Sequence, residues 1–123
     1  MSGEPDNFGY ACALDDDGNV LVVAAGGEDS NATGIEGNQA DNFETGSGAV
    51  YVFTLNALDQ WSQTTYVKAS NTDGGDAFGW SIATDGTGST VAVGSFNESS
   101  SSTGVGGSQI SDSMTGAGAV YLF

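Results

Sequence analysis

The chain has 123 residues, of which 20 are glycine and one is proline, and its formal net charge is −15, with Lys68 as the only basic residue and no histidine. This length predicts one domain, and the composition predicts short strands joined by turns. Such a charge repels phosphate backbones and anionic membrane surfaces, so we expect no nucleic-acid partner. The longest apolar runs are too short to span a bilayer, so we expect no membrane insertion.

The missing residue types also exclude classes of chemistry. Without histidine there is no Ser-His-Asp arrangement and no imidazole metal ligand, and without arginine there is no bidentate clamp for phosphate. A carboxylate pair for glycoside hydrolysis remains formally possible, but nothing singles out one pair. We therefore expect no enzymatic activity.

Two further expectations concern the single cysteine and the start of the chain. Cys12 stands alone, so it forms no intramolecular disulfide, and we interpret it as a buried small apolar side chain. The opening Met1-Ser-Gly-Glu-Pro has neither a basic nor an apolar region, so no signal peptide is expected.

In chain order, apolar runs bounded by turn residues predict seven strands, at residues 8–14, 20–25, 48–54, 61–69, 78–84, 90–95 and 118–123. The runs at 20–25 and 48–54 are apolar on both faces, which indicates that both faces are covered. The run at 61–69 is more polar, and we interpret its Lys68 as protection of an outer sheet edge.

The second half of the chain repeats the first. Residues 6–53 align with 76–123 without a gap, and 20 of these 48 positions are identical. Asp6-Asn-Phe-Gly-Tyr returns as Asp76-Ala-Phe-Gly-Trp, and Gly48-Ala-Val-Tyr-Val-Phe53 returns as Gly118-Ala-Val-Tyr-Leu-Phe123. A fixed period indicates a unit that must stack on its neighbours to bury its faces.

Repeated antiparallel sheets covered on both faces are typical of β-propeller blades. We therefore predict an all-β fold of two consecutive blades, with residues 1–75 as a first, four-stranded blade and residues 76–123 as a second blade that lacks its outer strand. A β-sandwich is the alternative, although it does not require gapless repeats.

Three segments resemble the FG-GAP repeat: Phe8-Gly9, Val22-Val-Ala-Ala-Gly26 and Gly48-Ala-Val-Tyr-Val-Phe53. This repeat builds the seven-bladed propeller of integrin alpha chains and of bacterial, archaeal and algal surface proteins. The resemblance covers nearly the whole chain and implies a propeller at the cell surface or outside the cell. The fold hosts adhesion, scaffolding and enzyme appendages alike, so it does not imply one function.

The resemblance also implies a calcium loop between the first and second strands of a blade. The corresponding turn is Asp15-Asp-Asp-Gly-Asn19, in which Asp15, Asp17 and Asn19 have the alternate spacing that aims oxygens inward. Ca²⁺ is therefore the candidate cofactor. The same residues are also ordinary hairpin signals, and in the second copy only Asp85 remains as a charged ligand.

The long polar loop at 26–47 and its counterpart offer further oxygens. In the family such loops lie on one face of the propeller, where they could form an acidic partner site or remain solvated excursions. The residues of this acidic face are Asp6, Glu28, Asp29, Asn31, Asp41, Asn42, Glu44, Asp73, Asp76, Glu98 and Asp112. Asn31 and Asn97 also fit the N-glycosylation pattern. The pairs Phe8/Phe78 and Tyr10/Trp80 are expected to pack between blades, with a sugar-stacking platform as the alternative.

Two blades cannot close a ring, so we expect either a piece of a longer repeat protein, as part of a larger propeller, or a subunit that is completed by other chains. In both cases we expect contacts with other blades or copies of the same protein, through residues such as Leu21 and its counterpart Val91. Three or four copies would close a ring of six or eight blades, and a filament is the open alternative. The predicted function is a non-enzymatic extracellular structural or adhesive module. The alternatives are a calcium-dependent module that binds carbohydrate or protein, and an appendage of a hydrolase.

Overall fold

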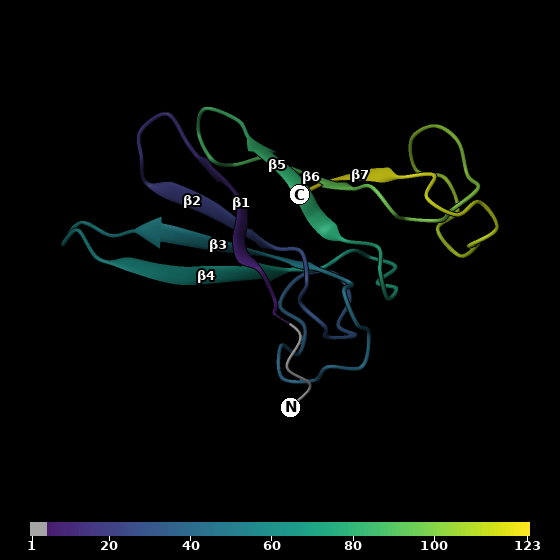
Figure 1. The fold of residues 1–123 in the computed structure, drawn as a ribbon. Coiled ribbons are helices and arrows are strands. Elements are labelled where there is room, and N and C mark those ends of the chain that lie inside the picture. The colour runs from purple at the N-terminus through teal and green to yellow at the C-terminus, as the bar shows by residue number, and fades with distance from the viewer. Residues whose placement is uncertain (1–4) are drawn as a thin grey trace.

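The fold consists of two antiparallel sheets, described by a computed structural model over residues 5–123 (Figure 1). Residues 1–4 of the predicted 1–75 unit, on which the signal-peptide expectation rests, lie outside the described residues. The first sheet has the order β1-β2-β3-β4 and the second the order β5-β6-β7. The strands are β1 (Phe8–Leu14), β2 (Val20–Ala25), β3 (Ala49–Leu55), β4 (Trp61–Val67), β5 (Phe78–Thr84), β6 (Val91–Ser95) and β7 (Ala119–Leu122).

The predicted all-β class is confirmed, and every predicted strand end lies within two residues of an observed one. The strands form where β-branched and aromatic residues gather, and they end where Gly, Asn and Asp supply turn geometry. The β3–β4 turn is an example, because the side-chain oxygen of Asn56 accepts the N–H groups of Leu58 at 2.8 Å and Gln60 at 3.1 Å.

The two copies share one backbone register. Ala13 pairs with Val22 in the first sheet, as Ala83 pairs with Ala92 in the second. β1 and β5 each have an irregularity in their strand pairing just after the first residue of the strand, where Gly9 and Gly79 adopt φ values of 90° and 92°. A side chain at these positions would be strained, so the repeated glycine produces the repeated bend.

The two sheets pack face to face, with β5 against β1, β2 and β3. We call the packed side of the first sheet the trailing face and the packed side of the second sheet the leading face. Val22, Ala24, Val50 and Val67 of the trailing face form one buried cluster with Phe78, Val91, Val93 and Tyr121 of the leading face. This cluster buries one face of the apolar runs at 20–25 and 48–54, and apolar burial is the main force that holds the sheets together. Within the described residues, the expectation that both faces are covered is met by a packed sheet only on the side of the second sheet.

The backbones approach closely at the rim of this cluster. Gly48 has a φ of +83°, and a Cβ atom there would lie 2.1 Å from the carbonyl oxygen of Phe78. The N–H of Phe78 donates to the carbonyl oxygen of Ser47 at 3.0 Å. Glycine at position 48 therefore lets the second sheet dock against the end of β3.

The short hairpin turns and the long loops lie at opposite ends of the sheets (Figure 1). The loop after β2, the loop after β6 and the connection between β4 and β5 gather at one end, as the family resemblance implied. The acidic residues of these loops are thus brought to one end of the molecule.

The expectation for Cys12 is wrong, because its thiol-bearing side chain is exposed. β1 has a hydrogen-bonded neighbour along only one edge, and most of its residues are exposed. β5 packs against one side of β1, where Ala11 joins the buried cluster, but Cys12 pairs with Val23 on the opposite side, which the second sheet does not cover. The apolar alternation of the strand does not show which side is covered.

Candidate functional site

The β1–β2 turn contains the predicted calcium ligands, and its geometry has a structural explanation. The side-chain Oδ1 of Asp15 accepts the N–H groups of Asn19 at 2.7 Å and Val20 at 2.9 Å. Asp15 is buried, whereas Asp17 and Asn19 are exposed. The Asp15 carboxylate therefore closes the hairpin turn.

The second copy uses its aspartate in the same way. Oδ1 of Asp85 accepts the N–H groups of Ser89 at 2.8 Å and Thr90 at 3.0 Å. These hydrogen bonds, led by the one from the backbone of Thr90, lower the pKa of Asp85. Within residues 5–123, no three acidic, cysteine or histidine side chains come together in a group able to hold a metal ion. Calcium binding by Asp15, Asp17 and Asn19 stays a prediction.

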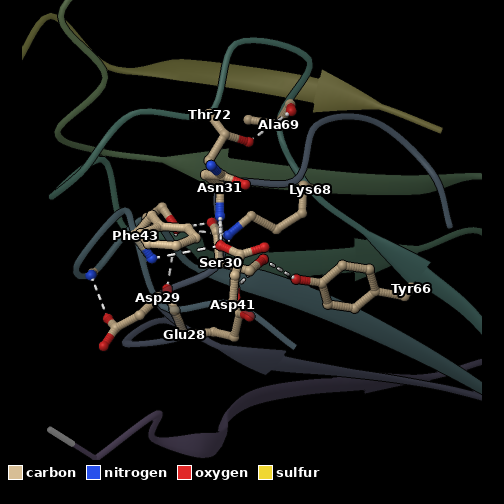
Figure 2. Close-up of polar contacts among 12 residues, drawn as sticks. Glu28, Asp29, Ser30, Asn31, Asp41, Phe43, Tyr66, Lys68, Ala69 and Thr72 are labelled. Carbon is tan, nitrogen blue, oxygen red and sulfur yellow. Dashed lines mark hydrogen bonds and ion pairs between the residues drawn. The ribbon is translucent and has the colours of Figure 1, made fainter. Parts of the chain in front are cut away.

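The most highly organised polar group is a buried cluster that we call the Lys68 centre: Lys68, Glu28, Ser30, Ser47 and Tyr66 (Figure 2). Nζ of Lys68 donates to Oε2 of Glu28 at 2.7 Å and to Oγ of Ser47 at 2.6 Å. Oγ of Ser30 lies 2.6 Å from Oη of Tyr66 and 3.3 Å from Oε2 of Glu28. The charges of the ion pair are thus neutralised and hydrogen-bonded in the interior.

The long loop after β2 builds this centre by folding over β4. The N–H of Lys68 donates to the carbonyl oxygen of Gly34 at 2.8 Å, and the N–H of Tyr66 donates to Oε1 of Glu36 at 2.7 Å. Ile35 forms an isolated bridge with Val67. The outer edge of β4 is therefore paired with residues 34–36 where the strand ends.

Burial controls the protonation of the centre. Desolvation lowers the pKa of Lys68, and the hydrogen bond and charge of Glu28 oppose that shift. Desolvation also raises the pKa of Tyr66, which remains a neutral hydroxyl. The same cause raises the pKa of the neighbouring Tyr51 to about 12. The centre is a hydrogen-bonded ion pair that lies out of contact with solvent.

The interpretation of Lys68 as edge protection is therefore wrong. Its side chain is fully buried, because the loop at 34–36 covers the end of β4 and leaves Lys68 facing Glu28. Glu28 and Asp29 are also buried rather than displayed on an acidic face. Asp29 instead accepts the N–H of Gly46 at 2.7 Å and fixes the end of the loop.

One sequence signal could have indicated this centre. Only three acidic residues of the first copy are identical in the second, namely Asp6, Asp15 and Glu28. The other six acidic residues of the first copy are replaced by non-acidic residues in the second, so an unchanged glutamate suggests a fixed structural partner. The single lysine of the chain was the available cation.

Four acidic residues, Asp73, Asp76, Glu98 and Asp112, form a cluster between the β4–β5 connection and the loop after β6, with Glu44 near Asp73. Asp76 is 5% exposed, and its Oδ2 accepts no hydrogen bond from residues 5–123. Burial, followed by the charges of Asp73, Glu98 and Asp112, raises the pKa of Asp76 to about 6. Burial and the charges of Asp112, Glu44 and Glu98 likewise raise the pKa of Asp73. In this acidic cluster, burial and repulsion between neighbouring carboxylates disfavour the ionised forms of Asp73 and Asp76.

The other predicted positions fall into two groups. Asn31 and Asn97 are exposed, as glycosylation would require, and their glycosylation stays a prediction. Tyr10 and Trp80 of the two sheets contact each other with ring centroids 4.8 Å apart, although both remain about half exposed. Phe78 is buried between the sheets, whereas Phe8 is exposed, so the packing of these pairs between blades stays a prediction.

Comparisons with protein-family models, with curated proteins and with solved structures found no match to this chain. Among the described residues, no helix has the length and hydropathy needed to cross a membrane.

Proposed function

We propose that the chain is a non-enzymatic, extracellular structural or adhesive module whose two sheets are β-propeller blades that stack on further blades of the same kind. The FG-GAP-like residues at Phe8-Gly9 and Gly48–Phe53 support this assignment. The loops on one side would then be displayed to partners by a rigid scaffold.

One observation carries the proposal: the two outer faces of the molecule are exposed copies of the two faces buried inside it. Phe78 on the leading face of the second sheet is 0% exposed, whereas its counterpart Phe8 is 59% exposed. Val50 on the trailing face of the first sheet is 0% exposed, whereas its counterpart Val120 is 72% exposed. The free leading face keeps Phe8, Val23 and Tyr51, whereas the free trailing face keeps Val120 but has Ala92 and Gly94 in place of Val22 and Ala24.

The aromatic side chains on the leading face of the first sheet contact one another in the same way as their counterparts on the buried leading face of the second sheet. The Phe8 ring contacts Tyr51 and Phe53 edge to face, at centroid distances of 5.4 Å and 6.2 Å. The Phe78 ring contacts Tyr121 and Phe123 at 5.4 Å and 5.9 Å. An aromatic surface that packs against a sheet in one copy is therefore present, and uncovered, in the other.

The predicted contact residues fit this arrangement. Val91 lies buried between the two sheets, whereas its counterpart Leu21 remains half-exposed on the free leading face. A second copy of the chain would present Val120 and Leu122 to this face, head to tail. Exposed apolar faces of this kind favour association.

Sedimentation velocity tests the proposal. At micromolar concentration the protein should form species larger than a monomer, either discrete rings of three or four copies or a series that grows with concentration. Leu122→Asp, on the free trailing face, should give monomers. Ile110→Asp adds the same charge to an exposed loop position and should leave the assembly unchanged. A folded wild-type monomer at these concentrations would overturn the proposal, as would equal dissociation by both variants.

A further inference from the structure

The outer edge of β7 has no strand beside it in residues 5–123, although its counterpart β3 is fully paired. β4 pairs antiparallel with β3, with Val67 opposite Val50 and Tyr66 opposite Tyr51. The counterparts of Val50 and Tyr51 in β7 are Val120 and Tyr121. β7 thus presents the backbone groups that β4 uses in the first copy, and an open edge is a template for another strand.

A buried carboxylate near this edge has no cationic partner among residues 5–123. Glu98, the counterpart of Glu28, is 2% exposed. Its side-chain oxygens accept hydrogen bonds from Nδ2 of Asn71 at 3.1 Å and from the N–H of Ser100 at 3.0 Å and 3.1 Å. The only ion pair among the described residues is that of Lys68 with Glu28. A buried carboxylate held by neutral donors alone is costly, so Glu98 favours a cationic partner.

A groove of about 820 Å³ is lined by β7, by the loop that corresponds to the β4-covering loop, and by Trp80, Ser81, Gly94 and Ser95 of β5 and β6, so it also extends over the free trailing face of the second sheet. In the first copy, residues 34–36 pair with the far edge of Tyr66, Val67 and Lys68. Their counterparts, residues 104–106, line one wall of the groove, and Val120 to Leu122 line the other. Glu98 and Ser100 also line it, and they correspond to Glu28 and Ser30 of the Lys68 centre.

We propose that this groove binds an extended protein segment as a fourth strand antiparallel to β7, with a tyrosine and a lysine two residues apart so that the lysine pairs with Glu98. The first copy sets the register: the tyrosine lies opposite Tyr121, and the next residue lies opposite Val120. The tyrosine hydroxyl then reaches Ser100, as Tyr66 reaches Ser30. Backbone hydrogen bonds supply affinity in such strand addition, and the side-chain pockets supply specificity.

The groove differs from its first-copy counterpart in two polar residues. Glu36, whose Oε1 accepts the N–H of Tyr66, is replaced by Gly106, so the backbone of a bound tyrosine lacks that acceptor. Ser47, whose hydroxyl accepts the second hydrogen bond from Lys68, is replaced by Ala117. The bound lysine therefore has one fewer acceptor than Lys68. Restoring the hydroxyl with Ala117→Ser should tighten binding.

The test uses a capped, fluorescently labelled peptide with the sequence of residues 61–69, titrated with the full chain at physiological ionic strength. A second peptide carries Lys68→Gln. In a third, Val67 and Lys68 exchange places, so its composition and charge match the first. This third peptide controls for unspecific attraction to a chain of net charge −15.

The first peptide should bind saturably, and both altered peptides should bind at least about tenfold more weakly, because the buried charged hydrogen bond is lost. Ala117→Ser should increase the affinity for the first peptide only, and binding should slow amide hydrogen exchange in β7. The proposal is overturned if the peptide does not bind, if the exchanged peptide binds equally well, or if slowed exchange appears in β3 instead of β7. None of these readouts requires the chain to self-associate, so failure here and failure of the stacking proposal are separate results.

Discussion

At the scale of single residues, the Lys68 centre joins segments that are far apart in the sequence. Glu28 begins the long loop, Ser47 ends it, and Lys68 follows β4. One ammonium group therefore fixes both ends of the loop to the outer strand. Removing either charge leaves the other buried and unpaired, which is more costly than the pair itself is stabilising.

Lys68→Met should lower the free energy of unfolding by about 3 kcal/mol, and Glu28→Gln by a similar amount. The double variant should lose clearly less than the sum, because it leaves no unpaired charge. Denaturant unfolding measures all three, with Asp59→Asn as a control in the exposed β3–β4 turn. Additive losses, or a loss below about 1 kcal/mol in each single variant, would contradict a coupled buried pair.

Asp76 predicts an unusual pH dependence. Its folded-state pKa of about 6 lies above the ordinary value of 3.8, so the folded state binds the proton more tightly than the unfolded state. The contribution of Asp76 to stability is full below about pH 4 and is lost as the pH rises through about 6.

Asp76→Asn removes this buried negative charge and should raise the free energy of unfolding at pH 7 by about 1 kcal/mol after allowance for solvent screening. As the pH falls from 7 to 5, the free energy of unfolding of the wild type should rise relative to that of the variant. Asp6→Asn changes the exposed counterpart and serves as the control. Equal destabilisation by Asp76→Asn at both pH values would contradict the raised pKa of Asp76.

At the scale of the elements, the strands could be predicted because their signals are local. Apolar runs, turn residues and the gapless repeat located all seven strands, and the same register in both sheets follows from the repeat. What could not be predicted was which residues would be covered. Lys68 is buried by a loop 30 or more residues earlier in the chain, and Cys12 is exposed because it lies on the face of the first sheet that the second sheet does not cover. Both depend on contacts between distant segments, which periodicity does not encode.

The β1–β2 hairpin allows a sharper test of calcium than the sequence alone suggested. Asp15→Ala opens the turn, at a cost of about 1–2 kcal/mol, whether or not a metal binds. Asp17→Ala is more informative, because Asp17 is an exposed predicted ligand. If the site binds Ca²⁺, calcium should raise the melting temperature more than magnesium at matched ionic strength, and Asp17→Ala should abolish the difference, whereas Asp59→Ala should preserve it. Equal shifts for both ions, unchanged by Asp17→Ala, would leave only general screening of charge.

At the scale of the whole molecule, the repeat predicts how one copy would meet the next. Tyr10 of the first sheet contacts Trp80 of the second, and these residues are themselves counterparts in the repeat. If copies stack head to tail, Trp80 of one copy should meet Tyr10 of the next in the same manner. A two-fold symmetric dimer would instead bring identical positions together.

Cross-linking through single cysteines tests this stacking most directly. In a Cys12→Ser background, Tyr10→Cys and Trp80→Cys are made separately, mixed at micromolar concentration and treated with a short thiol-specific cross-linker. Head-to-tail stacking predicts that the main product joins one chain of each variant, and that neither variant alone forms a cross-linked dimer efficiently. Products that join two copies of the same variant, or the absence of any cross-linked product, would contradict the stacking of repeated sheets between copies.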